Sequence, residues 1–115
     1  MIIKNGLVFQ ENGTFSRKTV YIKNHKIVES ENQLDDKTVI DAEGLMVIPG
    51  LVDIHSHGAA GCDFSDGDQE GLKAILKYQR KSGITSYCPT SMTLPEEQLV
   101  RIFETVQNIE GAPDE

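Results

Sequence analysis

Short runs of alternating apolar and polar positions fill the first 48 residues. Residues 19–23, Thr-Val-Tyr-Ile-Lys, alternate with a period of two, which predicts a half-buried strand. Asn24 and His25 follow, and both residue types tolerate the positive φ of a tight turn, so we expect a hairpin into residues 26–29. His25 is therefore interpreted as an exposed turn residue rather than a ligand.

Further short strands are expected in the same region. Glu11-Asn12-Gly13-Thr14 has the composition of a second hairpin turn, which we expect to join residues 7–9 to the strand at residues 19–23. Residues 39–40 and 46–48 complete a set of short strands. The first 48 residues thus form an all-β region.

The pattern changes at Pro49-Gly50. Residues 51–54 are a nearly continuous apolar run, which is typical of a buried parallel strand. Residues 57–68 are rich in glycine and acidic residues and are expected to form a loop. A second strand is predicted at residues 84–88, where Pro89 stops it.

Two amphipathic helices are predicted from apolar residues at helical spacing. We expect Asp66 or Asp68 to cap the first helix and Gly83 to end it, while Thr93-Leu94-Pro95-Glu96 resembles a capping box for the second. The apolar positions are Leu72, Ile75 and Leu76 in the first helix and Leu99, Ile102, Phe103 and Val106 in the second, which residues 111–113 are expected to end.

The resulting order after residue 49 is strand, loop, helix, strand, helix, which indicates parallel strands joined by a right-handed crossover. The predicted fold class is therefore α/β, with β-strands in residues 1–48 and two βα units in residues 49–115. A complete (β/α)8 barrel needs roughly 200 residues, more than the 115 present.

Composition narrows the expected partners and compartment. The chain has 18 Asp and Glu against 11 Lys and Arg, and this net charge of −7 argues against nucleic acid and anionic membranes as partners. No apolar run approaches the roughly 20 residues of a membrane span, and the first residues lack the pattern of a signal peptide. Two cysteines are too few for a disulfide framework, so we expect a cytoplasmic protein.

His55-Ser56-His57 is the sharpest chemical signal. Both histidines share one face at the carboxyl end of a predicted strand, where α/β proteins place their active sites, so they are candidate metal ligands. Asp53 has the same parity and is expected to orient a ligand, to be a ligand itself, or to accept hydrogen bonds from backbone amides. Two unrelated loop histidines are the alternative.

The acidic loop permits two interpretations. Cys62 and its acidic neighbours Asp63, Asp66 and Asp68 have ligand chemistry, but helix capping explains the acids and is favoured. Cys88 is expected to be a small buried residue rather than a nucleophile.

Thr90, Ser91 and Thr93 follow the second predicted strand. The loop that contains them is expected to face the same side of the sheet as His55 and His57, because the carboxyl ends of parallel strands meet at one edge. These hydroxyl side chains are therefore candidates for binding substrate, although capping already accounts for Thr93.

Residues 41–58 resemble the entry into the barrel of the metal-dependent amidohydrolase superfamily. Within it, residues 57–67 and 82–93 are most similar to the N-acetylglucosamine-6-phosphate deacetylase family. The resemblance implies that residues 1–48 belong to a small β-sandwich and that residues 49–115 begin an incomplete (β/α)8 barrel. It also implies that the chain matches only about the first third of such an enzyme.

The resemblance implies a concrete activity. His55 and His57 would hold part of a divalent metal site, zinc or iron, and metal-bound hydroxide would attack the acetamide of a small-molecule amino-sugar phosphate. The remaining ligands, the catalytic aspartate and the phosphate-binding residues are expected beyond Glu115. The 115-residue chain alone is therefore expected to be inactive, and its unpaired strand edges predict self-association or a homodimer.

Two alternatives remain open from the sequence. The chain resembles, more distantly, a cyclic-amide or dipeptide hydrolase of the same superfamily. It could also be a small non-enzymatic α/β metal-binding module, with Cys62 or Asp63 as extra ligands.

Overall fold

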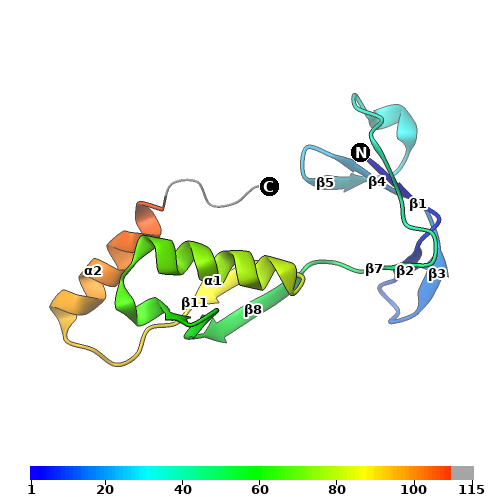
Figure 1. Cartoon of the computed structure of the whole chain (residues 1–115). Helices are drawn as coiled ribbons and strands as arrows, with labels where there is room; N and C mark the ends of the chain where they lie inside the picture. Colours follow the sequence, from blue (N-terminus) through cyan, green and yellow to red (C-terminus); the bar gives the residue numbers. More distant parts are fainter. Residues whose placement is uncertain (110–115) are drawn as a thin grey trace. The chain divides into compact units, whose positions relative to one another are not determined.

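The computed structural model describes residues 1–109 and divides the chain into two compact units, Met1–Pro49 and Gly50–Glu115 (Figure 1). We refer to them as unit 1 and unit 2. Unit 1 contains only strands and one short 3-10 turn, η1 (Glu31–Gln33), whereas unit 2 contains both strands and helices. The mixed α/β class that the sequence predicts is confirmed at this level.

A four-stranded sheet forms one part of unit 1, in the order β5-β4-β1-β6. Strand β1 (Ile2–Lys4) pairs antiparallel with β4 (Val20–Lys23) and parallel with β6 (Val39–Asp41). The expected hairpin from β4 into β5 (Lys26–Val28) is confirmed, because its two turn residues have φ of 49° and 61°. The second of these, His25, is exposed as predicted.

The second sheet of unit 1 has the order β3-β2-β7, with β2 at Leu7–Phe9 and β7 at Met46–Val47. The expectation that β2 forms a hairpin with the strand at residues 19–23 is wrong. Its partner is β3 (Phe15–Arg17), because the turn closes as soon as the Gln10 amide donates to the Thr14 carbonyl at 2.8 Å. The three-residue strand β3 is too short to show alternation in the sequence.

Few side chains of unit 1 are buried. Its buried apolar residues are Ile2, Leu34 and Ala42, while Ile27 on β5 is 78% exposed. Backbone pairing and turn geometry therefore account for most of the visible order in this unit.

Unit 2 is built around two parallel strands, β8 (Leu51–Ser56) and β11 (Ile84–Pro89). Helix α1 (Gln69–Lys81) connects them and packs along β11 (Figure 1). The parallel pair with its connecting helix confirms the predicted order of elements. The expected burial of β8 is wrong, because the side chains of Val52 and Ile54 are 63% and 75% exposed. Within the described residues, no other element packs over these two side chains closely enough to bury them.

The glycine-rich segment after β8 is more ordered than the expected loop. It forms a small antiparallel hairpin of β9 (Gly58–Ala59) and β10 (Cys62–Asp63), followed by the 3-10 turn η2 (Phe64–Asp66). Two-residue strands give no readable periodicity, which is why the sequence did not predict them. Gly58 is required here, because a Cβ atom would overlap the Cys62 carbonyl of the paired strand.

The two helices begin differently. The side chain of Asp68 accepts from the Gly71 amide at 2.6 Å and caps α1, as one of the two predicted alternatives requires. The predicted capping box at Thr93 is wrong: α2 (Glu96–Gln107) begins after Pro95, whose carbonyl accepts the first amide hydrogen bonds, and no side chain caps it. Residues 111–113, expected to end α2, lie outside the described residues.

The core of unit 2 is a cluster of buried apolar residues. Helix α2 contributes Ile102, which is fully buried, but Phe103 and Val106 are exposed, so the predicted apolar stripe is only partly used. Thr105 is the other buried residue of α2, and its hydroxyl lies 3.2 Å from the Gly67 carbonyl and 3.1 Å from the Arg101 carbonyl. The cluster consists of Phe64, Leu72 and Ile102, with Leu76, Leu94 and Ile109 packed against it.

Candidate metal centre

Two histidines lie together at the carboxyl end of β8. His55 belongs to the strand and His57 follows its last residue. Their rings are in edge contact, with centroids 5.2 Å apart and planes at 87°. His55 is exposed and His57 is half-buried, so a small ligand can reach this end of the strand.

His57 is anchored by both its backbone and its ring. Its carbonyl accepts from the Phe64 amide at 2.7 Å, which ties it to the core of unit 2. Its Nδ1 atom lies 2.9 Å from the Thr90 carbonyl, just beyond the end of β11. The carboxyl ends of both parallel strands therefore meet at this histidine.

Asp53 serves the backbone rather than the imidazole rings. One carboxylate oxygen accepts from the His55 amide at 3.0 Å, and the other accepts from the Gln79 side chain of α1 at 3.2 Å. Acceptance from a backbone amide is one of the predicted roles, and the His55 amide fulfils it. The carboxylate thus helps to shape the strand that carries His55.

The acidic residues from the end of β10 to the start of α1 act as caps. Asp63 accepts from the Ser65 amide at 2.7 Å, and Asp66 accepts from the Asp63 amide at 3.2 Å. With Asp68 at the start of α1, all three acids have the capping roles that the sequence favoured. Cys62 is half-buried and its Sγ lies 4.0 Å from the Ala60 carbonyl.

Cys88 is exposed, so its predicted burial is wrong. It lies on β11, and the described residues leave that position of the strand uncovered. The sequence pattern alone cannot tell which face of a strand has a neighbouring layer.

The loop after β11 contacts the candidate site through its backbone rather than through its hydroxyl groups. Thr90 contributes its carbonyl to His57, and its hydroxyl donates to the Cys88 carbonyl at 3.3 Å. Ser91 is half-buried, while Thr93 is exposed. Two further groups at this end of the strands were not predicted from the sequence. They are the Thr90 carbonyl and the Tyr87 hydroxyl, which donates to the Ser56 carbonyl at 3.0 Å. No sequence signal marks a backbone acceptor.

The two imidazoles fit a divalent transition metal in part. Neutral imidazole is a good ligand for zinc and iron, and the carbonyl contact at Nδ1 of His57 leaves Nε2 as the other ring nitrogen. Zinc usually takes at least three protein ligands. Within residues 1–109 there is no group of three or more His, Cys, Asp or Glu residues placed to hold an ion. The pair thus offers two candidate ligands, fewer than a zinc ion usually takes.

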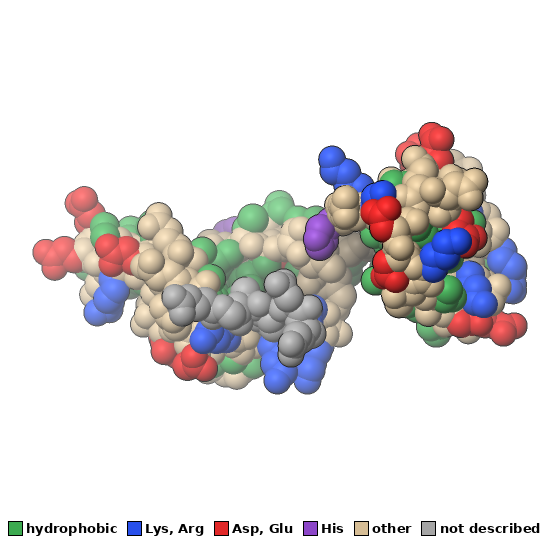
Figure 2. Space-filling model, turned by 90° about the horizontal axis from the view of Figure 1, so that it is seen from above, with side chains coloured by type: hydrophobic (Ala, Val, Ile, Leu, Met, Phe, Trp, Pro, Cys, Tyr) green, Lys and Arg blue, Asp and Glu red, His purple; other side chains and the backbone are tan. Residues whose placement is uncertain are grey.

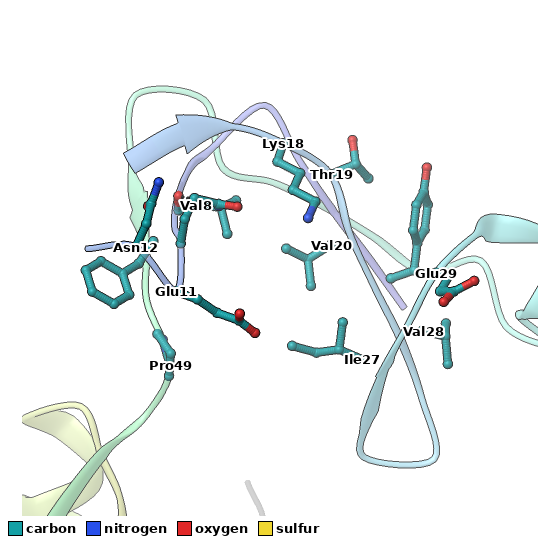
Figure 3. Close-up of a pocket in the computed structure, with 13 residues that line it drawn as sticks. Val8, Glu11, Asn12, Lys18, Thr19, Val20, Ile27, Val28, Glu29 and Pro49 are labelled. Atoms are coloured by element: carbon teal, nitrogen blue, oxygen red, sulfur yellow. Dashed lines mark hydrogen bonds between the residues drawn. The ribbon is translucent and has the colours of Figure 1, made fainter. Parts of the chain in front are cut away.

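An open hollow lies in unit 1. It is an open groove of about 950 Å³ between its two sheets, and in Figure 3 Val8 and Glu11 lie across from Val20 and Ile27. Its lining contains no histidine or cysteine. The groove therefore lacks the imidazole and thiolate ligands that are typical of zinc sites.

Two carboxylates of unit 1 have perturbed acidity. The Thr38 hydroxyl and amide hold the pKa of Asp36 below its usual value. The Asn5 side-chain amide, followed by the Glu43 amide, lowers the pKa of Asp41 in the same way. Both carboxylates fasten turns at the ends of β6 and play no part in the histidine pair.

The face in Figure 2 carries basic side chains among acidic ones, with hydrophobic side chains open on both units. None of the helices within residues 1–109 is both long enough and apolar enough to cross a bilayer.

The sequence matches the model of the amidohydrolase family over residues 38–108, more than half of the chain. An N-acetylglucosamine-6-phosphate deacetylase of Lysinibacillus sphaericus is 32% identical over 95 residues, which cover 81% of this chain and 24% of the relative. A dihydroorotase of Staphylococcus aureus is 33% identical over 115 aligned positions, which cover 94% of this chain and 25% of the relative. The chain thus spans about a quarter of these curated relatives.

The fold has a counterpart among solved structures. The N-acetylglucosamine-6-phosphate deacetylase of Pasteurella multocida superposes with a TM-score of 0.79 and 22% identity, over 94% of this chain and 30% of that one. At this identity the likeness concerns the fold. The family match over residues 38–108 and the conserved arrangement of elements lead to one conclusion: the chain belongs to the amidohydrolase family.

Proposed function

We propose that this chain is the N-terminal part of a metal-dependent deacetylase that removes acetate from N-acetylglucosamine 6-phosphate. Unit 1 would supply strands of a small β-sandwich, and unit 2 would supply the first two βα units of a (β/α)8 barrel. The observation that carries the proposal is the His55–His57 pair at the carboxyl end of β8, next to the end of β11. Active sites of such barrels lie at that end of the strands.

In this proposal His55 and His57 hold one side of a zinc or iron ion. When bound, such an ion supplies Lewis-acid chemistry toward the amide carbonyl of the substrate. Asp53 keeps the backbone of His55 in place, and Thr90 orients the ring of His57. The remaining ligands and the group that moves the proton would come from polypeptide outside this chain, so the 115 residues alone are expected to be inactive.

The exposed apolar residues of β8 support an incomplete barrel. Val52 and Ile54 are largely exposed, although strands of a complete barrel pack against neighbours on both faces. We also propose that the isolated chain self-associates through the open edges of β8 and β11, because unpaired strand edges are prone to pair. Sedimentation at two concentrations tests this, and a single monomeric mass at both would contradict it.

We place the protein in the cytoplasm, because Cys62 and Cys88 are both free thiols. Fractionation of cells that express the tagged gene product would test the location, and recovery outside the cytoplasm would contradict it.

The activity is tested on the full-length product of the gene that encodes this chain. Acetate release from N-acetylglucosamine 6-phosphate is measured beside release from unphosphorylated N-acetylglucosamine and hydrolysis of dihydroorotate. We expect the phosphorylated sugar to be the best substrate. Dihydroorotate is the second candidate, because a 33% identical relative is a dihydroorotase, and preference for it would overturn the proposal.

A pair of matched variants connects the activity to the site. His57→Asn removes a proposed ligand, and we expect a loss well beyond the roughly 10–100-fold that follows removal of an outer-shell partner. His25→Asn changes an exposed turn residue of unit 1 to another residue that tolerates positive φ, and we expect full activity. Equal activity of both variants would count against the metal site.

A further inference from the structure

The Ser56 carbonyl, which lies between the two histidines, accepts two hydrogen bonds. One comes from the Thr90 amide at 2.9 Å and the other from the Tyr87 hydroxyl at 3.0 Å. Thr90 therefore contacts two consecutive residues, because its amide donates to Ser56 and its carbonyl faces the ring of His57. We call Tyr87 and the Thr90 backbone the Thr90 clamp.

Within the clamp, the Thr90 carbonyl determines which nitrogen of a neutral His57 ring carries the proton. A backbone carbonyl can only accept, so the 2.9 Å contact requires the proton to be on Nδ1. The lone pair is then on Nε2. Histidines that bind metals commonly donate their second ring N–H to a carbonyl in this way, which fixes both the tautomer and the ring orientation.

His55 differs from its neighbour in this respect. Its backbone amide is held by Asp53, while its ring is exposed and contacts the ring of His57. The two proposed ligands are therefore unequal, because the His57 ring contacts the segment after the second strand, whereas the His55 ring contacts the ring of His57.

We propose that Tyr87 is a positioning residue, which acts through Ser56 and Thr90 to keep His57 in the tautomer with a free Nε2. The metal-binding role of His57 rests on the proposed function, whereas the position of the proton on its ring does not. Tyr87 is half-buried, and its hydroxyl is the one part of the clamp that a side-chain substitution can remove. Losing it leaves the Ser56 carbonyl with one donor and loosens the link between the strand ends.

The experiment is a long-range ¹H–¹⁵N NMR spectrum of the labelled 115-residue chain at a pH of about 8, where ordinary imidazoles are neutral. We expect His57 to be in the Nδ1–H form and His25 to be a mixture of tautomers. Tyr87→Phe should shift His57 toward a mixture, while the amide signals of unit 2 stay in place. Tyr78→Phe, at a residue of α1 that is 52% exposed, should leave His57 unchanged.

A zinc titration provides the second readout. We expect Tyr87→Phe to weaken zinc binding on the order of 10-fold and Tyr78→Phe to leave it unchanged. If the chain binds no zinc but the His57 tautomer responds to Tyr87→Phe, the clamp stands and the metal half-site fails. If zinc binds equally to all variants and His57 is a mixture in each, the clamp is overturned while the proposed function survives.

Discussion

The two units reach order by different means. Unit 2 buries an apolar cluster that joins the helices to the η2 turn, and its fully buried side chains include Ile75 and Ile102. Unit 1 buries three apolar side chains and keeps an open groove between its sheets. The difference shows that the candidate site depends on the packing of unit 2, because the His57 carbonyl accepts a hydrogen bond from the amide of Phe64 in the apolar cluster.

The largest expected effect is a cavity in the core of unit 2. Ile102→Ala should destabilise unit 2 by about 2–5 kcal/mol, because a fully buried side chain leaves a cavity. Ile27→Ala, at a residue of unit 1 that is mostly exposed, should change stability by no more than about 0.5 kcal/mol. Urea unfolding followed by amide NMR signals of each unit separates the two effects, and equal shifts would break the comparison.

A smaller effect is expected at the close approach of β9 and β10. Gly58→Ala places a Cβ against the Cys62 carbonyl, so it should cost about 1–3 kcal/mol and alter the hairpin that follows His57. The matched variant is Gly13→Ala in the hairpin of unit 1, where φ is +79° and the space is open. Its cost should be about 1 kcal/mol, from backbone conformation alone. Retention of the Ala59–Cys62 pairing in Gly58→Ala, seen by NOE contacts, would contradict the overlap.

Helix capping sharpens the comparison within unit 2. Asp68→Ala removes the acceptor for the Gly71 amide and should destabilise the unit by about 1 kcal/mol. Thr93→Ala tests the rejected capping box before α2 and should have almost no effect, since no side chain caps that helix. Thermal unfolding monitored by circular dichroism measures the change in stability for each variant. A larger loss of stability for Thr93→Ala than for Asp68→Ala would show that Thr93 caps α2.

The smallest effect is a pH dependence of unit 1. The lowered pKa of Asp36 contributes stability above the unfolded-state value of about 3.9, which is lost as the pH falls through the lower folded-state pKa. Thr38→Val removes the hydroxyl donor and should raise the pKa of Asp36 toward its ordinary value. The pKa of Asp41, which depends on Asn5, serves as the internal control. An NMR titration that shows no rise at Asp36 would contradict the assigned cause.

Local chemistry made much of the fold predictable. The Asn24-His25 turn, the Asp68 cap and the positive φ at Gly83 follow from residues that act within a few positions of one another. The parallel pair of β8 and β11 followed from the alternation of strand and helix.

Burial was predicted less well, because it depends on layers that local pattern does not specify. The β8 residues Val52 and Ile54 have the composition of a buried strand, yet the described residues leave them open. On α2, the buried residues are Ile102 and the polar Thr105, a face different from the full apolar stripe.

The candidate site was likewise predictable only in part. Spacing identified His55 and His57, and the capping roles of the acidic residues were predicted from their positions before helical turns. The contact between His57 and the Thr90 carbonyl joins positions 33 residues apart through the backbone, so no side-chain pattern could reveal it.

The most direct test of the central claim, that His55 and His57 form half of a metal site, is a zinc titration observed at the imidazole nitrogens of the labelled chain. We expect the ring signals of His55 and His57 to shift together while those of His25, in the turn of unit 1, stay in place. Shifts at His25 as large as those at the pair, or no shift at either member of the pair, would contradict it.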